Sequence, residues 1–315
     1  MNILLTAVGK RVQLIKCLQR NAKVFGCDIS GLAPAAKFVD GFFKVKKYNE
    51  EGYIEDIFNI CKKEKIDFLI PLFEREFLSL CTYRKELREL GTELILSGKS
   101  IIEICNDKWK TYEFFKENNI DSPITYLKDK INKEIIYPLI IKPLDGMGSS
   151  SVFKINNEKE LNFFSEYVEN PILQQFIEGK EYTIDTLCDL KGRVIFAIPR
   201  ERIEVRSGEV TKSRTVKDEN IIKAVKNLCE KLQKEASKNG DNVVGPLTIQ
   251  CIVDSRGKVY FIEINPRFGG GVPLSFEAGG DYGKCFKDIK NNINIETIDD
   301  FKELTMLRYD EAIYV

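Results

Sequence analysis

The stretch Lys258-Val-Tyr-Phe-Ile-Glu263-Ile-Asn265-Pro-Arg267-Phe-Gly-Gly-Gly271 narrows the chemistry of this chain more than any other. Apolar and polar residues alternate along it, as in a half-buried strand, and glycines end the strand in a turn. Glu263 and Asn265 are two residues apart, so their side chains point from the same face of a strand. A carboxylate beside an amide suits Mg²⁺ held together with substrate phosphates, and Arg267 can clamp a phosphoryl group through its fork of donors. An ordinary edge strand with a solvated face would show the same pattern.

The composition describes a globular protein of two or three domains and argues against several classes of partner. Of the 315 residues, 43% are apolar and 30% are charged, and 48 basic residues balance 48 acidic ones. Because the net charge is zero, no strong field attracts nucleic acid or an anionic membrane. The first residues lack the basic start and apolar length of a signal peptide, and no run is long enough to span a membrane. We therefore expect neither a nucleic-acid nor a membrane partner.

Cysteine and histidine usage restricts the chemistry further. The nine cysteines are scattered, odd in number and form no Cys-x-x-Cys pair, which predicts free thiols in a reducing cytoplasm. Histidine is absent, which excludes His-based triads, His-ligated zinc and imidazole proton shuttles. Any catalysis must therefore use carboxylates, amides, Lys, Arg, backbone N–H groups or a metal.

The first third of the chain alternates predicted strands and helices, which indicates an α/β domain with a parallel sheet and helices on both faces. Gly9 and Asp28 stand where a dinucleotide site would need them, but Gly9 is alone where Gly-x-Gly-x-x-Gly is required. We expect Gly9 to serve a tight turn and a helix start instead. The predicted strands cover residues 2–7, 24–28, 68–71 and 93–96, and the predicted helices cover residues 11–20, 54–63 and 77–90.

After Asn106 the pattern changes to strands in hairpin-like succession around a few helices. Asn106 is a plausible N-cap for a helix that runs to about residue 118. The pattern predicts a two-lobed α+β unit, and three domains at residues 1–106, 107–178 and 179–315. The later predicted strands cover residues 171–175, 181–189, 193–199, 209–216, 243–253 and 259–264, and the later predicted helices cover residues 158–168, 220–238 and 284–291.

A second chemical signal is a strand that delivers Lys142 into a Gly/Ser loop, residues 146–151. Glycines let backbone N–H groups approach phosphate oxygens closely, while Lys142 adds a point charge. The spacing is not that of a Walker loop. A mobile hairpin loop without a ligand would have the same composition.

A third signal is the strand-to-turn segment of residues 172–183. Where this segment leaves the strand, its backbone N–H and C=O groups can bind the edge of an adenine. Phe176 and Ile177 can then pack against the face of the adenine ring. Glu181 can accept the hydroxyl protons of a ribose. Alone, this segment is a weak signal.

Taken in order along the chain, these segments resemble the ATP-grasp family. The first third also looks like the N-terminal α/β domain of that family, so the resemblance covers nearly the whole chain. Gln250 together with Glu-x-Asn-x-Arg resembles the carbamoyl-phosphate-synthase-like branch of small carboxylate–amine ligases, and the chain is far too short for a complete synthase. The corresponding positions are Lys108, Lys142-Pro143 with its loop, residues 174–181, Gln250 and Glu263-Ile-Asn265-Pro-Arg267.

The resemblance implies a fold and a set of roles. The fold is a pre-ATP-grasp α/β domain followed by a two-lobed ATP-grasp domain. One or two Mg²⁺ ions, with Mn²⁺ as an alternative, would bridge the β- and γ-phosphates of ATP. The residues implied for ATP are Lys108, Lys142, Met147, Gly148, Ser149, Ser150, Ser151, Gln174, Gln175, Phe176, Ile177 and Glu181. The residues implied for the metal are Gln250, Glu263 and Asn265.

The implied reaction activates a small carboxylate, expected to be an amino acid, as an acyl phosphate that an amine then attacks. Phosphoryl transfer depends on positioning and charge neutralisation more than on a side-chain base, so a chain without histidine can perform it. Gln174 replaces an acidic residue of many relatives, which would soften the selectivity for adenine. Gln250 is neutral, so one metal site is expected to be weak. The alternative is a catalytically idle ATP-binding module of the same fold. The sequence does not decide whether the chain forms a homodimer.

Two further clusters are candidates for contact with the substrate. Residues 200–212 alternate basic and acidic side chains, which is typical either of a solvated ion-pair ladder or of a cleft wall. In the second reading Arg200, Arg202 and Arg206 face the cleft, and Lys212 reaches the γ-phosphate or the substrate carboxylate. Residues 269–280 are either a flexible connection or a set of backbone donors for the acyl phosphate. The expected catalytic residues are therefore Arg267, Lys212 and Arg200.

Overall fold

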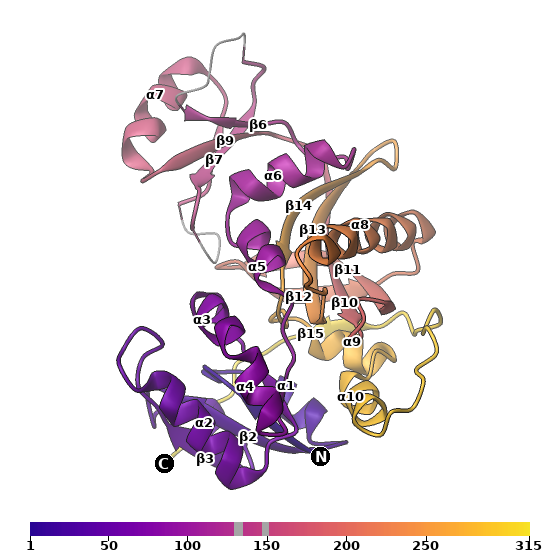
Figure 1. Cartoon of the computed structure of the whole chain (residues 1–315). Helices are drawn as coiled ribbons and strands as arrows, with labels where there is room; N and C mark the ends of the chain where they lie inside the picture. The colour runs from indigo at the N-terminus through magenta and orange to yellow at the C-terminus, as the bar shows by residue number, and fades with distance from the viewer. Residues whose placement is uncertain (129–134, 147–150) are drawn as a thin grey trace.

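The computed structural model describes residues 1–128, 135–146 and 151–315, and it builds the chain around three sheets (Figure 1). The first sheet has the strand order β3-β2-β1-β4-β5, and every neighbouring pair is parallel, as predicted. Ile3, Leu4 and Leu5 of its central strand are fully buried, because helices cover both faces. The strands are β1 (Asn2–Leu5), β2 (Lys23–Asp28), β3 (Gly41–Lys44), β4 (Phe68–Ile70) and β5 (Glu93–Leu94), and the helices are α1 (Val12–Leu18), α2 (Tyr53–Glu64), α3 (Phe77–Thr82) and α4 (Arg84–Glu89).

Several local predictions for this part were wrong. The single helix expected over residues 77–90 is two helices, α3 and α4, which Tyr83 separates with φ −103° and ψ 17°. Asn106 is not an N-cap: it ends helix α5 (Lys99–Cys105), which the sequence pattern did not indicate. The N-cap is Asp107, whose carboxylate accepts hydrogen bonds from the amides of the next helix, α6 (Lys108–Glu117).

The second sheet forms a small lobe, in pink at one end of the molecule in Figure 1. Its strand order is β6-β9-β7-β8, and all its pairs are antiparallel. Helix α7 (Glu158–Tyr167) packs on this sheet through Leu161 and Phe164. The strands are β6 (Thr125–Leu127), β7 (Leu139–Pro143), β8 (Phe153–Ile155) and β9 (Pro171–Gln175).

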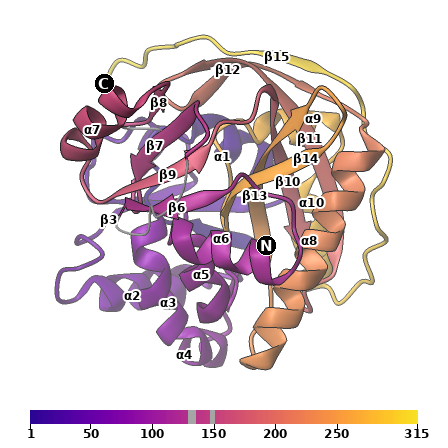
Figure 2. The same ribbon diagram turned by 90° about the horizontal axis from the view of Figure 1, so that it is seen from above.

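The third sheet is the largest, with the strand order β14-β13-β10-β11-β12-β15 and antiparallel pairing throughout. Helix α8 (Glu219–Lys238) lies along one face and shares a core with α5 and α6 (Figure 2). The three sheets fall within the three predicted domains, whose boundaries stay a prediction. The remaining elements are β10 (Gly179–Cys188), β11 (Val194–Arg206), β12 (Glu209–Thr215), β13 (Gly245–Asp254), β14 (Val259–Asn265), β15 (Thr305–Leu307), α9 (Pro273–Ala278) and α10 (Tyr282–Lys290).

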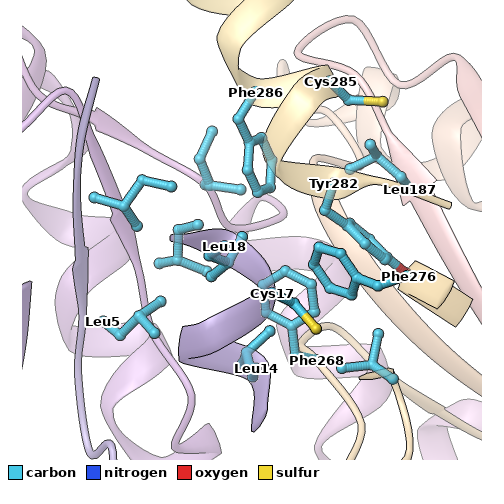
Figure 3. Packing of buried hydrophobic residues seen from close by; sticks show 14 of the residues in the cluster. Leu5, Leu14, Cys17, Leu18, Leu187, Phe268, Phe276, Tyr282, Cys285 and Phe286 are labelled. Carbon is cyan, nitrogen blue, oxygen red and sulfur yellow. The ribbon is translucent and has the colours of Figure 1, made fainter. Parts of the chain in front are cut away.

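One apolar core joins the first sheet to the third. Figure 3 shows Leu14 and Leu18 of α1 facing Phe276 of α9 and Phe286 of α10. The ring of Tyr282 lies at the centre of this core and contacts several neighbouring rings edge-on, at centroid distances near 5 Å. Because such interiors are close-packed, the N-terminal domain and the large sheet hold a fixed relation. This relation matters because both contribute residues to the candidate site.

The described residues contain no helix that is long and apolar enough to cross a membrane. All nine cysteines lie within the described part of the chain, and each is a free thiol. Burial raises the pKa of several of these thiols, that of Cys17 to about 11.

Candidate active site

The three residues predicted as metal ligands meet at one end of the large sheet. Asn265 ends β14, and its Nδ2 atom donates to Glu263 Oε1 over 2.7 Å, so the two side chains share a face as predicted. Gln250 on β13 lies directly opposite Glu263 in the strand pairing. The register shifts between Gln250 and Cys251, which is a β-bulge of the kind that re-aims side chains at strand ends.

Two lysines approach from the other side of the same region. Lys108 lies in the first turn of α6, and its ammonium group donates to the carbonyl oxygens of Leu144 and Gly146, at 3.0 and 2.7 Å. Lys142 on β7 is buried, and its ammonium donates to Gln174 Oε1 over 2.9 Å. Burial lowers the pKa of Lys142 to about 8, although the Glu263 carboxylate opposes this shift. Burial also lowers the pKa of Lys108.

These groups line a cavity of about 270 Å³ between the small sheet and the large one. Its lining contains the two lysines and Glu263, and also apolar side chains such as Ile252 and Phe176. A phosphate chain and a base together require a lining with both charged and apolar groups. The predicted residues that line this cavity are Lys108, Lys142, Gln174, Gln175, Phe176, Ile177, Glu181, Gln250 and Glu263.

The other five residues predicted for the nucleotide belong to the Gly/Ser loop. Met147, Gly148, Ser149 and Ser150 lie outside the described residues, so their role stays a prediction. Ser151 is described and has a left-handed φ of +56°, but it is not among the residues that line the cavity.

Glu181, the predicted ribose ligand, pairs with a residue that the spacing of the sequence motifs did not indicate. Its carboxylate forms an ion pair with Arg202 Nε over 2.8 Å. Burial raises the pKa of Glu181, and the Arg202 guanidinium opposes the shift. Arg202 lies on the neighbouring strand β11, which also delivers Arg200, so the two arginines share one face of the large sheet.

Arg200 and Arg202 open onto a second cavity of about 220 Å³ on the far side of Glu263. Arg11 of the N-terminal domain and the glycines of residues 269–271 complete its wall. A third cavity, of about 350 Å³, lies beside Glu74, Lys108 and Arg267. Glu263 lines all three cavities, so it stands at their junction.

Arg200 has one donor with no protein partner. The side chain is only 1% exposed, and its Nε and Nη2 atoms donate to the carboxylate of Asp185 at 2.6 and 3.0 Å. Its Nη1 atom has no hydrogen-bond partner anywhere in the described residues. A Cβ atom at Gly271 would lie closer to Nη1 than van der Waals contact allows. Nη1 is itself buried, and it fits there only because residue 271 has no side chain.

Arg267 stands at the junction of two cavities, and Glu74 fixes its direction. The Nε and Nη2 atoms of Arg267 both lie against Glu74 Oε1, at 2.7 and 2.6 Å. The two residues are 193 positions apart, so no local pattern could have indicated the pair. Arg11 also faces this region, and burial together with the nearby Arg267 charge lowers the pKa of Arg11.

The structure does not bring Lys212 to the site, so that expectation needs correction. Lys212 is half exposed and pairs with Glu204 over 2.8 Å, and it lines none of the three cavities. Two register shifts, around Glu204, change the face to which β11 and β12 direct their later residues. Arg206 is likewise exposed, so the ladder is a cavity wall at Arg200 and Arg202 and a solvated ion-pair ladder beyond them.

The predicted metal ligands fit a divalent cation only together with a ligand from substrate. In residues 1–128, 135–146 and 151–315, no three Asp, Glu or Cys side chains gather closely enough to hold a metal ion alone. Glu263, Asn265 and Gln250 supply a carboxylate and two amide oxygens. Mg²⁺ typically takes one or two protein carboxylates and completes its shell with phosphates and water, so this donor set fits it.

Comparisons with known proteins agree with this architecture, in which a small and a large antiparallel sheet enclose a nucleotide-sized cavity. A family model described as "ATP-grasp domain" matches residues 105–271, more than half of the chain. The chain belongs to the ATP-grasp family. A second model, "PylC-like, N-terminal domain", matches residues 3–95 and accounts for the parallel sheet.

The sequence relatives are much longer proteins than this chain, which matches only part of each. The carbamoyl phosphate synthase large chain of Clostridium acetobutylicum is 28% identical over 293 residues, which cover 85% of this chain and 26% of the relative. That of Caldanaerobacter subterraneus subsp. tengcongensis is 30% identical over 253 residues, 74% of this chain and 22% of the relative. The chain therefore spans about a quarter of the length of these relatives.

Solved structures show the shared fold. N5-carboxyaminoimidazole synthetase from Staphylococcus aureus complexed with ADP has a TM-score of 0.76 at 18% identity, over 98% of this chain and 82% of that one. L-amino acid ligase from Bacillus licheniformis has a TM-score of 0.67 at 20% identity, over 92% of this chain and 74% of that one.

Proposed function

We propose that this protein is an ATP- and Mg²⁺-dependent ligase that activates a small carboxylate as an acyl phosphate and couples it to an amine. The observation that carries the proposal is the position of Glu263 between two cavities. One of these cavities has both the charged and the apolar groups that suit ATP, and the other is lined by arginines, one of which has an unpartnered donor. ADP and inorganic phosphate would be the other products.

The nucleotide would lie with its base against Phe176 and Ile177 and its phosphates toward Lys108 and Lys142. The ADP complex of the Staphylococcus aureus structure of the same fold supports nucleotide binding. Bound Mg²⁺, or Mn²⁺ in its place, would supply charge neutralisation between the β- and γ-phosphates. Glu263, Asn265 and, more weakly, Gln250 would hold the ion from the protein side.

The carboxylate substrate would lie in the cavity beyond Glu263. Arg200 lines this cavity, and its buried Nη1 atom, which has no partner in the described residues, would donate to a carboxylate oxygen that reaches it. Arg11 lines the same cavity and has no ion-pair partner among the residues that the structure describes. Both groups favour an anionic substrate, and charge-assisted hydrogen bonds of this kind are roughly twice as strong as neutral ones.

In the first step a carboxylate oxygen would attack the γ-phosphorus of ATP, the bond from that phosphorus to the ADP oxygen would break, and ADP would leave. Arg267, held by Glu74 at the cavity junction, can stabilise the charge on the transferring phosphoryl group. In the second step a neutral amine nitrogen would attack the acyl carbon, the acyl–phosphate bond would break, and the departing phosphate would take the nitrogen's proton. Neither step requires an imidazole base, which this chain lacks.

The test identifies the carboxylate substrate first and the amine substrate second. The protein is incubated with Mg-ATP, a panel of amino acids and other small carboxylates, and hydroxylamine as a general nucleophile, and hydroxamate and phosphate are measured. A carboxylate that gives both products is then paired with candidate amines, and the product mass identifies the amide. Nucleotide binding without carboxylate-dependent phosphate release across the panel would favour the idle module instead. Glu263→Ala is the control for contaminating activity.

A further inference from the structure

The N-terminal domain contains a cavity of about 360 Å³ that shares no lining residue with the three cavities of the candidate active site. It lies at the carboxyl ends of β1, β2 and β3, where Ala7, Cys27 and Val45 reach it. Open α/β sheets generally bind ligands beyond the carboxyl ends of their strands. The volume is also within the range of small-molecule sites.

The cavity walls are aromatic and aliphatic. The rings of Tyr48 and Phe73 meet edge to face, with their centroids 5.7 Å apart, and Val45 and the half-exposed Ile29 add aliphatic surface. This arrangement forms a wall for a flat apolar group, because aromatic rings pack well in edge-to-face and offset contacts.

The one buried charge in the lining is already satisfied by the protein. Glu76 is 2% exposed, and its carboxylate accepts hydrogen bonds from the hydroxyl groups of Thr6 and Tyr53 and from the backbone N–H of Phe73. A ligand therefore needs no cationic group to neutralise the buried end of the cavity.

Basic and acidic side chains both lie around the mouth of the cavity. Lys44, Lys46 and Lys47 lie around it, and none of the three has an ion-pair partner in the described part of the chain. The nearby carboxylates are bound to backbone N–H groups instead: Asp56 accepts from Lys46 N and Glu50 accepts from Lys47 N, at 3.0 and 3.1 Å. The ammonium groups are thus available to an anion.

Asp28 distinguishes this cavity from a dinucleotide site. Its carboxylate accepts hydrogen bonds from Gly9 N over 2.9 Å and from Ser30 N over 3.2 Å. In a dinucleotide site the acidic residue at this strand end binds the ribose hydroxyls. Here the carboxylate closes the turn after β1, so it is not free for that role.

We propose that this cavity is a second ligand site, which binds a small aromatic anion with its ring between Tyr48, Phe73 and Val45 and its anionic group at Lys46 and Lys47. An aromatic carboxylate and a nucleoside monophosphate share this chemistry. The proposal does not depend on the ligase reaction.

Binding is measured by isothermal titration calorimetry on the full chain at low salt, with indole-3-acetate and AMP as probes and with indole-3-acetamide and adenosine as their neutral counterparts. We expect at least one anionic probe to bind about tenfold more tightly than its counterpart, because charge-assisted hydrogen bonds to the lysines add to ring burial. The probe that binds more tightly identifies the source of the anion. The proposal is overturned if neither anionic probe binds more tightly than its counterpart.

Variants of the protein show where the anionic probe binds. Lys46→Gln/Lys47→Gln changes only exposed side chains, so it should fold normally and weaken the anionic probe about tenfold. Lys191→Gln/Lys234→Gln removes two exposed lysines elsewhere and should have no effect. Val45→Trp should fill the cavity and abolish binding, and its circular dichroism spectrum checks the fold. Binding that the lysine double variant leaves unchanged would place the probe elsewhere, including the ATP cavity, and would refute the proposal.

Discussion

Nucleotide binding should draw protons from solution at pH 8–9, and Lys142 should be the group that takes them up. Burial lowers the pKa of this lysine to about 8, and the Lys108 charge adds to the effect, while Glu263 opposes it. A phosphate placed against the ammonium would favour its charged form and raise the pKa toward the ordinary value. The proton that the free protein lacks is then bound together with the nucleotide.

The expected stoichiometry follows from the pKa of about 8. Before binding, about a tenth of Lys142 is deprotonated at pH 7, about half at pH 8 and about nine tenths at pH 9. Uptake should therefore rise from about 0.1 proton per nucleotide at pH 7 to about 0.5 at pH 8 and about 0.9 at pH 9. Phosphate groups with a second pKa of about 6 are fully ionised at pH 8–9 and contribute little.

The assay is calorimetry of Mg-ADP binding in buffers of different ionisation enthalpy at each pH. The slope of the apparent enthalpy against the buffer's ionisation enthalpy gives the number of protons. Lys142→Met should remove most of the slope at pH 8, and Lys191→Met, at an exposed site, should keep it. A slope that stays near zero at pH 9 in the native protein, or that survives in Lys142→Met, would refute the reasoning.

The same lysine should reduce the free energy of unfolding in the free protein. Its folded pKa of about 8 lies below the unfolded value near 10.5, so the penalty is present in full below pH 8 and disappears as the pH rises from 8 to 10.5. A difference of about 2.5 pKa units corresponds to about 3 kcal/mol. Lys142→Met should therefore gain stability relative to the native chain at pH 7, and the gap should narrow by pH 10.

Three substitutions test the other parts of the site. Glu263→Ala should lower the ligation rate about 10²–10³-fold, with a melting temperature close to native; an unchanged rate would contradict its role at the cavity junction. Gly271→Ala should place a methyl group against Arg200 Nη1 and lower kcat/KM for the carboxylate about 10²-fold. The Kd for Mg-ADP should stay native, and a parallel loss of nucleotide affinity would argue against separate cavities. Glu74→Ala should release Arg267 and lower kcat about tenfold or more, measured in single-turnover experiments, where a native rate would show that Arg267 needs no such support.

Much of the fold and the metal end of the site followed from short-range rules. Glu263 and Asn265 share a face because strand residues alternate, and the structure joins them by a hydrogen bond. The parallel first sheet followed from alternating strands and helices. The same alternation failed at Lys212, because register shifts near Glu204 turn the strand and no sequence signal marks them.

Other parts of the site depend on contacts that no local pattern contains. Glu74 belongs to the N-terminal domain and holds Arg267, which follows the last long strand of the large sheet. Asp185 holds Arg200, and Ser275 Oγ donates to the same carboxylate over 2.6 Å from helix α9. Residues 273–278 form this helix, within a segment for which the sequence allowed either a flexible connection or a set of backbone donors. Only the packing of distant elements determines these pairs.

The surroundings of Arg200 favour a ligase over an idle nucleotide module. Burying a guanidinium and a carboxylate is costly even when the pair is well made, and an unsatisfied buried donor costs about 1–3 kcal/mol more. The chain satisfies two of the three guanidinium nitrogens through Asp185 and leaves Nη1 without a partner. A module that only held ATP would gain nothing from this, because Arg200 does not line the cavity that suits the nucleotide. The proposed anionic substrate, which would meet the γ-phosphate beside Glu263, would account for a buried guanidinium in the wall of that cavity.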